Sequence, residues 1–184
     1  MRIVAGSAKG VRLAPVPKGV RPVSDMAREG LFSSLGARVP GARVLDLFAG
    51  TGALGIEALS RGAAEAVFVD RARPSTSLIH ENLERARLRE LAVIVAGDVR
   101  TFLTREDKEG APFDLVLADP PYGLEGTELD VVLEELAGGW LAPSGWTIAL
   151  TRRKGSSTPV IPLHWLAARR LEYGDTLVLL LREA

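Results

Sequence analysis

The sequence predicts an α/β fold on a mostly parallel sheet, and three patterns carry this prediction. After Pro40 and Gly41, short apolar segments alternate with longer helical segments, the order expected of repeated strand and helix units. The apolar segments are uninterrupted, as in parallel strands that are covered on both faces. The chain closes with two apolar segments joined by Gly174 and Asp175, which is typical of a hairpin.

The individual elements follow in chain order. The expected strands are Arg43 to Leu47, Ala66 to Asp70, Ala92 to Ala96, Phe113 to Ala118, Trp146 to Leu150, Arg169 to Tyr173 and Thr176 to Arg182. The expected helices between them are Gly55 to Arg61, Pro74 to Arg87, Val99 to Lys108 and Leu129 to Leu136. A further helix is expected from Asp25 to Phe32, because Ser24 can cap it and its first turn is acidic.

The composition sets outer limits on function. The chain has 184 residues, 47% of them hydrophobic, which is enough for one sizeable core. It has no cysteine, so disulfides and thiolate metal sites are excluded, and no metal is implied. No segment approaches the roughly 20 consecutive apolar residues of a membrane span. We therefore expect a cytoplasmic protein without a membrane partner.

Charge is distributed unevenly along the chain. Residues 1–40 hold seven basic and two acidic residues, a net charge of +5 in a chain whose overall charge is zero. The basic residues are Arg2, Lys9, Arg12, Lys18, Arg21, Arg28 and Arg38. We expect residues 1–23 to form a basic arm or small hairpin that contacts a polyanion, attached to a domain of residues 24–184. A solvated surface segment is the alternative interpretation.

A glycine-rich loop follows the first expected strand. Residues 46–55 read Asp-Leu-Phe-Ala-Gly-Thr-Gly-Ala-Leu-Gly, at the carboxyl end of a strand where open α/β sheets bind ligands. The loop also matches a dinucleotide fingerprint, because Asp70 stands twenty residues after Gly50 and can accept from ribose hydroxyls. A nicotinamide cofactor is therefore a competing interpretation.

Two features favour S-adenosylmethionine over a dinucleotide. Asp46 ends the strand itself, and three residues separate it from the first glycine. A carboxylate here suits a cofactor that carries an ammonium and a sulfonium, whereas it would repel a pyrophosphate. Asp98 follows the third expected strand, where it can accept from the adenine amino group; a helix cap is the alternative role for Asp70 and Asp98.

The tetrapeptide Asp119-Pro120-Pro121-Tyr122 follows a buried strand. Its two prolines fix φ and remove two amide donors, so the turn is rigid and its carbonyl oxygens remain acceptors. An exocyclic base amine is a poor nucleophile, and hydrogen bonds to Asp119 and the Pro120 carbonyl would localise its lone pair for attack on a methyl group. Tyr122 offers a face for base stacking. An ordinary turn is the alternative.

Together these segments resemble the bacterial ribosomal RNA guanine-N2 methyltransferases of the RsmD family over nearly the whole chain. The resemblance is carried by residues 2–10, 21–25, 46–63, 119–122 and 173–176. It implies a class I, Rossmann-like S-adenosylmethionine-dependent methyltransferase, with a seven-stranded sheet whose last strand is antiparallel. The implied substrate is a guanine of small-subunit (16S) ribosomal RNA, within an assembled or assembling 30S particle.

The resemblance also assigns roles to residues. It implies a cofactor site formed by Asp46, Phe48, Ala49, Gly50, Thr51, Gly52, Gly55, Asp70, Arg71, Asp98, Val99 and Asp119. It implies that the target base is held by Asp119, Pro120, Pro121 and Tyr122. It implies RNA contacts by Arg2, Lys9, Arg12 and Arg21.

Three other functions are weighed against this one. A DNA adenine or cytosine amino-methyltransferase shares the chemistry, but about 60 residues outside the core leave little for sequence readout. A non-catalytic RNA-binding module does not account for the intact Asp119 to Tyr122 turn. A nicotinamide oxidoreductase leaves the same turn unexplained.

Overall fold

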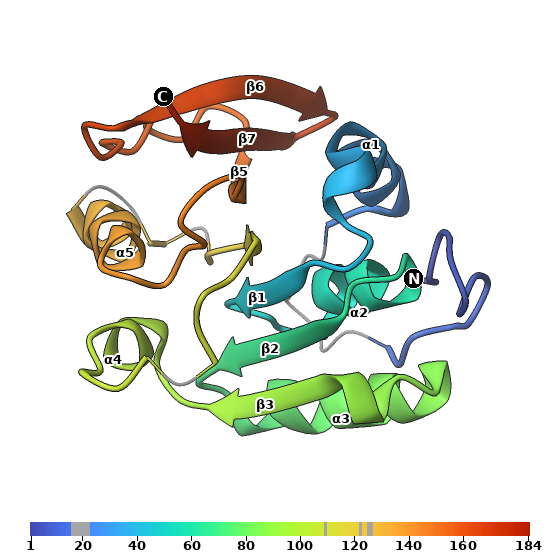
Figure 1. The fold of residues 1–184 in the computed structure, drawn as a ribbon. Coiled ribbons are helices and arrows are strands. Elements are labelled where there is room, and N and C mark those ends of the chain that lie inside the picture. Colours follow the sequence, from blue (N-terminus) through green and yellow to red (C-terminus); the bar gives the residue numbers. More distant parts are fainter. Residues whose placement is uncertain (16–22, 109, 122, 125–126) are drawn as a thin grey trace.

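The described chain forms one sheet and confirms the predicted α/β class. The computed structural model describes residues 1–15, 23–108, 110–121, 123–124 and 127–184. Its strands are β1 (Arg43–Leu47), β2 (Glu65–Asp70), β3 (Ala92–Ala96), β4 (Leu115–Ala118), β5 (Thr147–Arg153), β6 (Trp165–Tyr173) and β7 (Thr176–Glu183). They lie in the order β3-β2-β1-β4-β5-β7-β6 (Figure 1). The first five strands pair in parallel, and β7 is antiparallel to both β5 and β6, as the resemblance implies.

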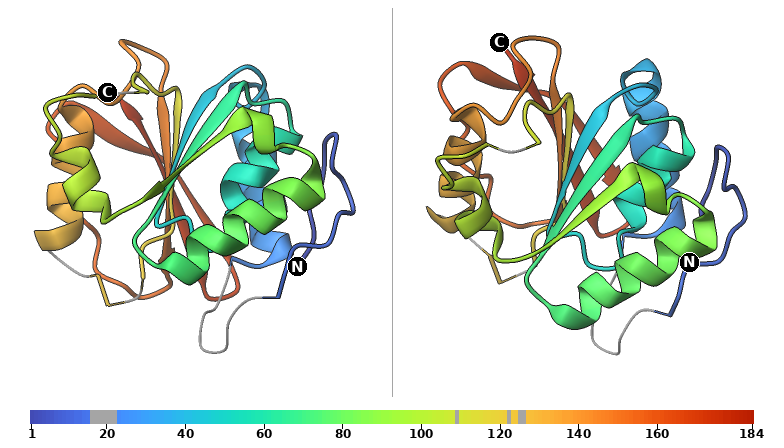
Figure 2. Two further views of the ribbon diagram at one scale, coloured as in Figure 1. Left: turned by 90° about the horizontal axis from the view of Figure 1, so that it is seen from below. Right: turned by 60° about the horizontal axis from the view of Figure 1, so that its bottom comes forward.

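Helices cover both faces of this sheet. They are α1 (Asp25–Leu35), α2 (Ala53–Ser60), α3 (Arg73–Ala86), α4 (Val99–Leu103) and α5 (Thr127–Ala137), with 3-10 turns η1 (Gly36–Arg38) and η2 (Arg89–Leu91). Figure 2 shows α1, α2 and α3 on one face and α4 and α5 on the other. α1 begins at Asp25 as predicted, and Ser24 caps it: its hydroxyl accepts from the backbone amide of Ala27 at 3.1 Å.

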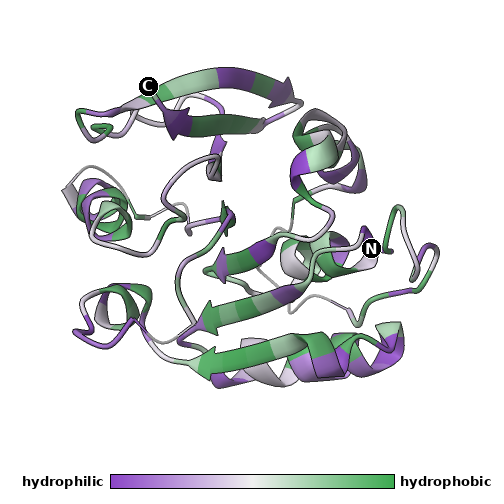
Figure 3. Cartoon of the chain, viewed as in Figure 1, coloured by the Kyte–Doolittle hydropathy of each residue, from purple (hydrophilic) through white to green (hydrophobic). Residues whose placement is uncertain are grey.

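The two layers explain why the strands are uninterrupted in apolar residues. Successive side chains of a strand point to opposite faces. Val44 packs into the core under α1, α2 and α3, whereas Leu45 packs into the core under α4 and α5. Hydrophobic residues accordingly run along the inner strands, while the helices mix hydrophobic and hydrophilic residues (Figure 3).

Several predicted boundaries are wrong. β5 extends to Arg153 instead of ending at Leu150, and β6 begins at Trp165 instead of Arg169, because both strands continue their pairing with β7. Two further differences have local causes. The helix expected from Val99 to Lys108 ends at Leu103, because the carbonyl of its last residue accepts hydrogen bonds from two side chains. The Leu103 oxygen accepts from the Trp140 indole and the Lys108 ammonium, both at 2.9 Å. The strand expected from Phe113 begins at Leu115, since Phe113 instead bridges to Leu141 outside the sheet.

The N-terminal segment forms a small hairpin that packs against the first layer. Arg2 and Arg12 face one another in an antiparallel bridge, and Ile3 and Leu13 are buried in the core beneath. This hairpin lies beside α2 and α3 in both views of Figure 2.

Within the described residues, no helix is long and apolar enough to cross a membrane.

The strand order places a crevice at the carboxyl edge of the sheet. The chain runs outward from β1 through β2 to β3, then returns to β4 on the opposite side of β1. Open α/β sheets bind ligands at such a switch point, outside the carboxyl ends of the strands.

Candidate active site

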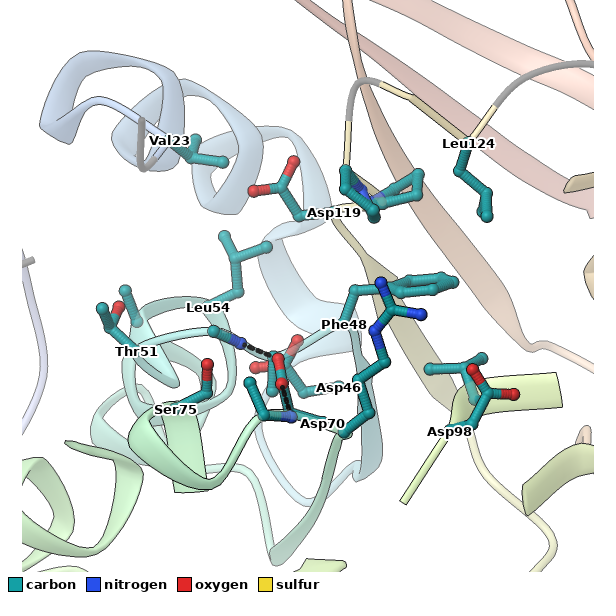
Figure 4. A pocket seen from close by; sticks show the side chains of 18 residues that line it. Val23, Asp46, Phe48, Thr51, Leu54, Asp70, Ser75, Asp98, Asp119 and Leu124 are labelled. Atoms are coloured by element: carbon teal, nitrogen blue, oxygen red, sulfur yellow. Dashed lines mark hydrogen bonds between the residues drawn. The ribbon is translucent and has the colours of Figure 1, made fainter. Parts of the chain in front are cut away.

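A cavity of about 530 Å³ lies at this crevice. The residues that line it come from the ends of β1, β2, β3 and β4, and Figure 4 shows Asp46, Asp70, Asp98 and Asp119 facing the same space. Of the cofactor residues implied by the sequence, the lining includes Asp46, Phe48, Ala49, Gly50, Thr51, Asp70, Arg71, Asp98, Val99 and Asp119. Segments that are up to 73 residues apart in the chain therefore meet in one place.

The glycine loop is held against the end of β2. The backbone amide of Ala49 donates to the Val69 carbonyl at 3.1 Å, and the amide of Gly50 donates to the Asp70 carboxylate at 2.8 Å. The other Asp70 oxygen accepts from the amide of Ala72 at 2.8 Å (dashed lines in Figure 4). Asp70 thus fixes the loop while it lines the cavity.

Two predicted cofactor residues, Gly52 and Gly55, do not line the cavity. Gly52 has a φ of 76° where α2 begins, a left-handed conformation that favours glycine. A Cβ on Gly55 would lie 2.3 Å from the Phe68 ring and 2.9 Å from an Asp46 carboxylate oxygen. Both glycines therefore shape the loop from behind, and their contact with the cofactor stays a prediction.

Asp46 is buried below the loop. One of its carboxylate oxygens accepts from the amide of Gly55 at 2.9 Å. Burial raises the pKa of Asp46 well above its usual value, and the nearby carboxylates of Asp119 and Asp70 raise it further, against the lowering effect of the Gly55 hydrogen bond. A cluster of carboxylates with this mutual repulsion favours a cationic ligand.

Asp98 has the helix-cap role considered for it, and its contact with the adenine amine stays a prediction. Its carboxylate caps α4 by accepting from the amide of Thr101 at 3.1 Å, and the residue also lines the cavity. The capping bond leaves the cavity-lining role intact, because the cap uses Oδ1 alone.

Asp119, Pro120 and Pro121 form the opposite wall of the cavity. The Pro121 carbonyl accepts from the amide of Leu124 at 2.9 Å, which closes the turn. Asp119 keeps part of its surface exposed in the cavity, but the surrounding walls displace most water and raise the pKa of its carboxyl group. Tyr122, predicted to stack on the base, lies outside the described residues.

Three of the predicted RNA-binding residues lie on the hairpin. Arg2, Lys9 and Arg12 have exposed side chains, and Arg21 lies outside the described residues.

The hairpin is anchored to α2 by polar groups that no sequence motif predicted. Glu57 accepts from the amides of Val4 and Ala5 at 2.8 and 3.0 Å.

Asn82, on α3, was also missed. It is buried, its side-chain oxygen accepts from the amide of Ala14 at 2.7 Å, and its side-chain nitrogen donates to the Thr51 carbonyl at 2.8 Å. One amide group therefore joins the hairpin to the glycine loop. A single asparagine in an amphipathic helix gives no sequence signal of this kind, because its partners are 68 and 31 residues away.

Comparison with known proteins identifies the family. The profile of the family described as Conserved hypothetical protein 95 matches residues 1–182. Ribosomal RNA small subunit methyltransferase D of Escherichia coli strain K12 is 35% identical over 177 residues, which are 95% of this chain and 86% of that protein. The chain belongs to the RsmD family.

Other RsmD relatives agree. The protein of the same name from Haemophilus influenzae is 30% identical over 168 residues, 90% of this chain and 84% of that protein. The solved structure of yhhF from Escherichia coli matches with a TM-score of 0.86 at 32% identity and covers 100% of this chain and 98% of that chain. RsmD membership confirms the predicted class I fold, the methyltransferase activity and S-adenosylmethionine as the cofactor.

Proposed function

We propose that this RsmD-family enzyme transfers a methyl group from S-adenosylmethionine to the exocyclic N2 amine of one guanine of 16S ribosomal RNA, within an assembled or assembling 30S particle. The observation that carries the proposal is the shared cavity, in which the Asp119-Pro120-Pro121 turn faces the glycine loop. The relatives named small-subunit ribosomal RNA methyltransferases support the substrate. A ribosomal substrate in turn supports a cytoplasmic location.

The residues of the cavity fit this cofactor. The wall holds several carboxylates, and Asp46 is repelled by two of them, so a ligand bearing an ammonium and a sulfonium relieves the repulsion. Asp70 would accept from the ribose hydroxyls and Asp98 from the adenine amine. A pyrophosphate in the same place would face Asp46 and Asp70, which disfavours the nicotinamide alternative.

Asp119 and Pro120 are the groups proposed to act on the base. When bound, the cofactor would supply a methyl group on a positively charged sulfur, so that the N–C bond would form as the C–S bond breaks and its electron pair returns to sulfur. Asp119 accepts an N–H of the amine and so localises the nitrogen lone pair. The raised pKa of Asp119 also makes its carboxylate a better acceptor for the proton that the methylated nitrogen sheds. Tyr122 stays the predicted stacking residue.

The hairpin is proposed to supply RNA affinity through Arg2, Lys9 and Arg12. Replacing all three by alanine should lower affinity and flatten the dependence of log K on log salt by up to about two units for three lost phosphate contacts. The measurement is a binding titration against undermethylated 30S particles across a salt series. A salt slope equal to that of the unmodified protein would contradict this role. The matched control replaces Arg85, Arg87 and Arg89, basic residues of the α3 region, and should leave the slope nearer to its original value.

The test of the function itself is transfer of labelled methyl groups to undermethylated 30S particles, free ribosomal RNA and duplex DNA, followed by nucleoside mass analysis. The expected product is N2-methylguanosine from a ribosomal substrate. Methyladenine or methylcytosine from DNA would support the DNA amino-methyltransferase instead. No product from any substrate would favour the RNA-binding module.

A further inference from the structure

Thr151 lies behind Asp119, on the neighbouring strand. β4 and β5 pair in parallel with Ala118 opposite Leu150, so Asp119, which follows β4, lies beside Thr151 of β5. Thr151 is buried, 1% exposed, and it is absent from the lining of the cavity. It therefore touches Asp119 from the protein interior and does not reach a ligand in the cavity.

The Thr151 hydroxyl has two partners. It hydrogen-bonds Oδ1 of Asp119, and it lies 3.2 Å from the carbonyl oxygen of Ala118. The carbonyl can only accept, whereas a hydroxyl both donates and accepts. When Asp119 is ionised, the hydroxyl donates to its carboxylate. When Asp119 is protonated, the carboxyl donates to the hydroxyl and the hydroxyl donates to Ala118.

We propose that Thr151 is a positioning residue, whose hydroxyl holds Oδ1 of Asp119 so that the second carboxylate oxygen is directed at the target amine. The pairing persists in both protonation states, so the carboxyl orientation is kept while a proton is taken up and released. The role rests on the proposed function, because it acts through the contact between Asp119 and the base. A side chain held in one orientation avoids the loss of rate that a misplaced acceptor causes.

The Thr151 hydrogen bond opposes the effect of burial on Asp119. Asp46 faces Asp119 from β1, and Arg152, next to Thr151, directs its guanidinium to the Leu124 carbonyl at 3.1 Å. Burial raises the pKa of Asp119, and the Thr151 hydrogen bond lowers it. Loss of the hydroxyl therefore moves the pKa of Asp119 further upward.

The test compares Thr151→Val, which keeps the shape and removes the hydroxyl, with Thr151→Ser, which restores it. We expect Thr151→Val to lower kcat by about 10- to 100-fold, the effect of losing one hydrogen bond to a charged group. Affinity for S-adenosylmethionine, measured by calorimetry, should not change. The acid limb of the pH profile of kcat/KM should move to higher pH. Thr151→Ser should restore both kcat and the profile.

Thr147 offers a matched control on the same strand. It is also 1% exposed, but its hydroxyl has no hydrogen-bond partner among the described residues, so Thr147→Val should leave kcat and the pH profile unchanged. Equal kcat and equal profiles for Thr151→Val and Thr147→Val would overturn the positioning role, as would failure of Thr151→Ser to restore activity. If Thr151→Val does not fold, the test compares the pKa of Asp119 in the unmodified protein with its pKa in Thr151→Ser, both read from carboxyl carbon NMR. A large difference between these two pKa values contradicts the proposal. An unmodified protein inactive on every RNA would instead refute the proposed function.

Discussion

Replacing Asp119 by alanine is expected to reduce kcat by about 100- to 1000-fold, the effect of removing one preorganised polar group from a reacting centre. The carboxylate is proposed to accept from the base amine, and the two prolines after it have no polar side-chain atom that could accept in its place. Affinity for S-adenosylmethionine should be retained, because the glycine loop is held by bonds to Asp70, Val69 and Asp46 rather than to Asp119. Single-turnover methyl transfer and calorimetric cofactor binding measure the two effects separately.

Asp119→Asn is an informative second variant at this position. The amide keeps one oxygen acceptor and the shape of the side chain, but it cannot take up a proton from the nitrogen. We expect its kcat to lie between those of the unmodified enzyme and the alanine variant. Turnover near normal in Asp119→Ala would remove Asp119 from the mechanism, and loss of cofactor binding in both variants would make it a cofactor residue only.

The sequence predicted the fold where local signals decide it. β1 and β3 match their predicted bounds because each is an apolar run between turn residues. α4 is shorter than predicted because Trp140, 37 residues later, binds the carbonyl at its end. Long-range contacts of this kind leave no pattern in a single sequence.

The same distinction between local signals and long-range contacts separates the site residues that the sequence predicted from those that it did not. The glycine loop and Asp119 belong to compact motifs with a chemical reason for each residue, so they were found. Thr151, Asn82 and Glu57 have partners that are 31 to 68 residues away, and each is an ordinary residue of its own strand or helix. Their roles depend on the strand order and on where the hairpin folds back, which only the structure supplies.

Replacing Glu57 by alanine is expected to lower the free energy of unfolding by about 3–5 kcal/mol, the cost of breaking a buried ion pair from one side. Glu57 is fully buried, and it binds the Arg61 guanidinium at 2.7 Å besides the two hairpin amides. It also lies near Arg28, a fully buried arginine whose pKa is lowered by burial and raised by Asp25 and Glu57. Without Glu57, the hairpin amides and the Arg28 charge lose a buried partner.

A second pair, on the surface, provides a control that separates the effect of burial from that of pairing. Glu81 and Arg85 have the same four-residue spacing and a distance of 2.6 Å, but their side chains are 49% and 44% exposed. Glu81→Ala should therefore cost only about 0.3–0.5 kcal/mol. Urea unfolding of both variants measures the difference, and similar values would show that Glu57 does not anchor the hairpin. Because the hairpin carries the basic side chains, Glu57→Ala should also weaken 30S binding, whereas Glu81→Ala should leave it unchanged.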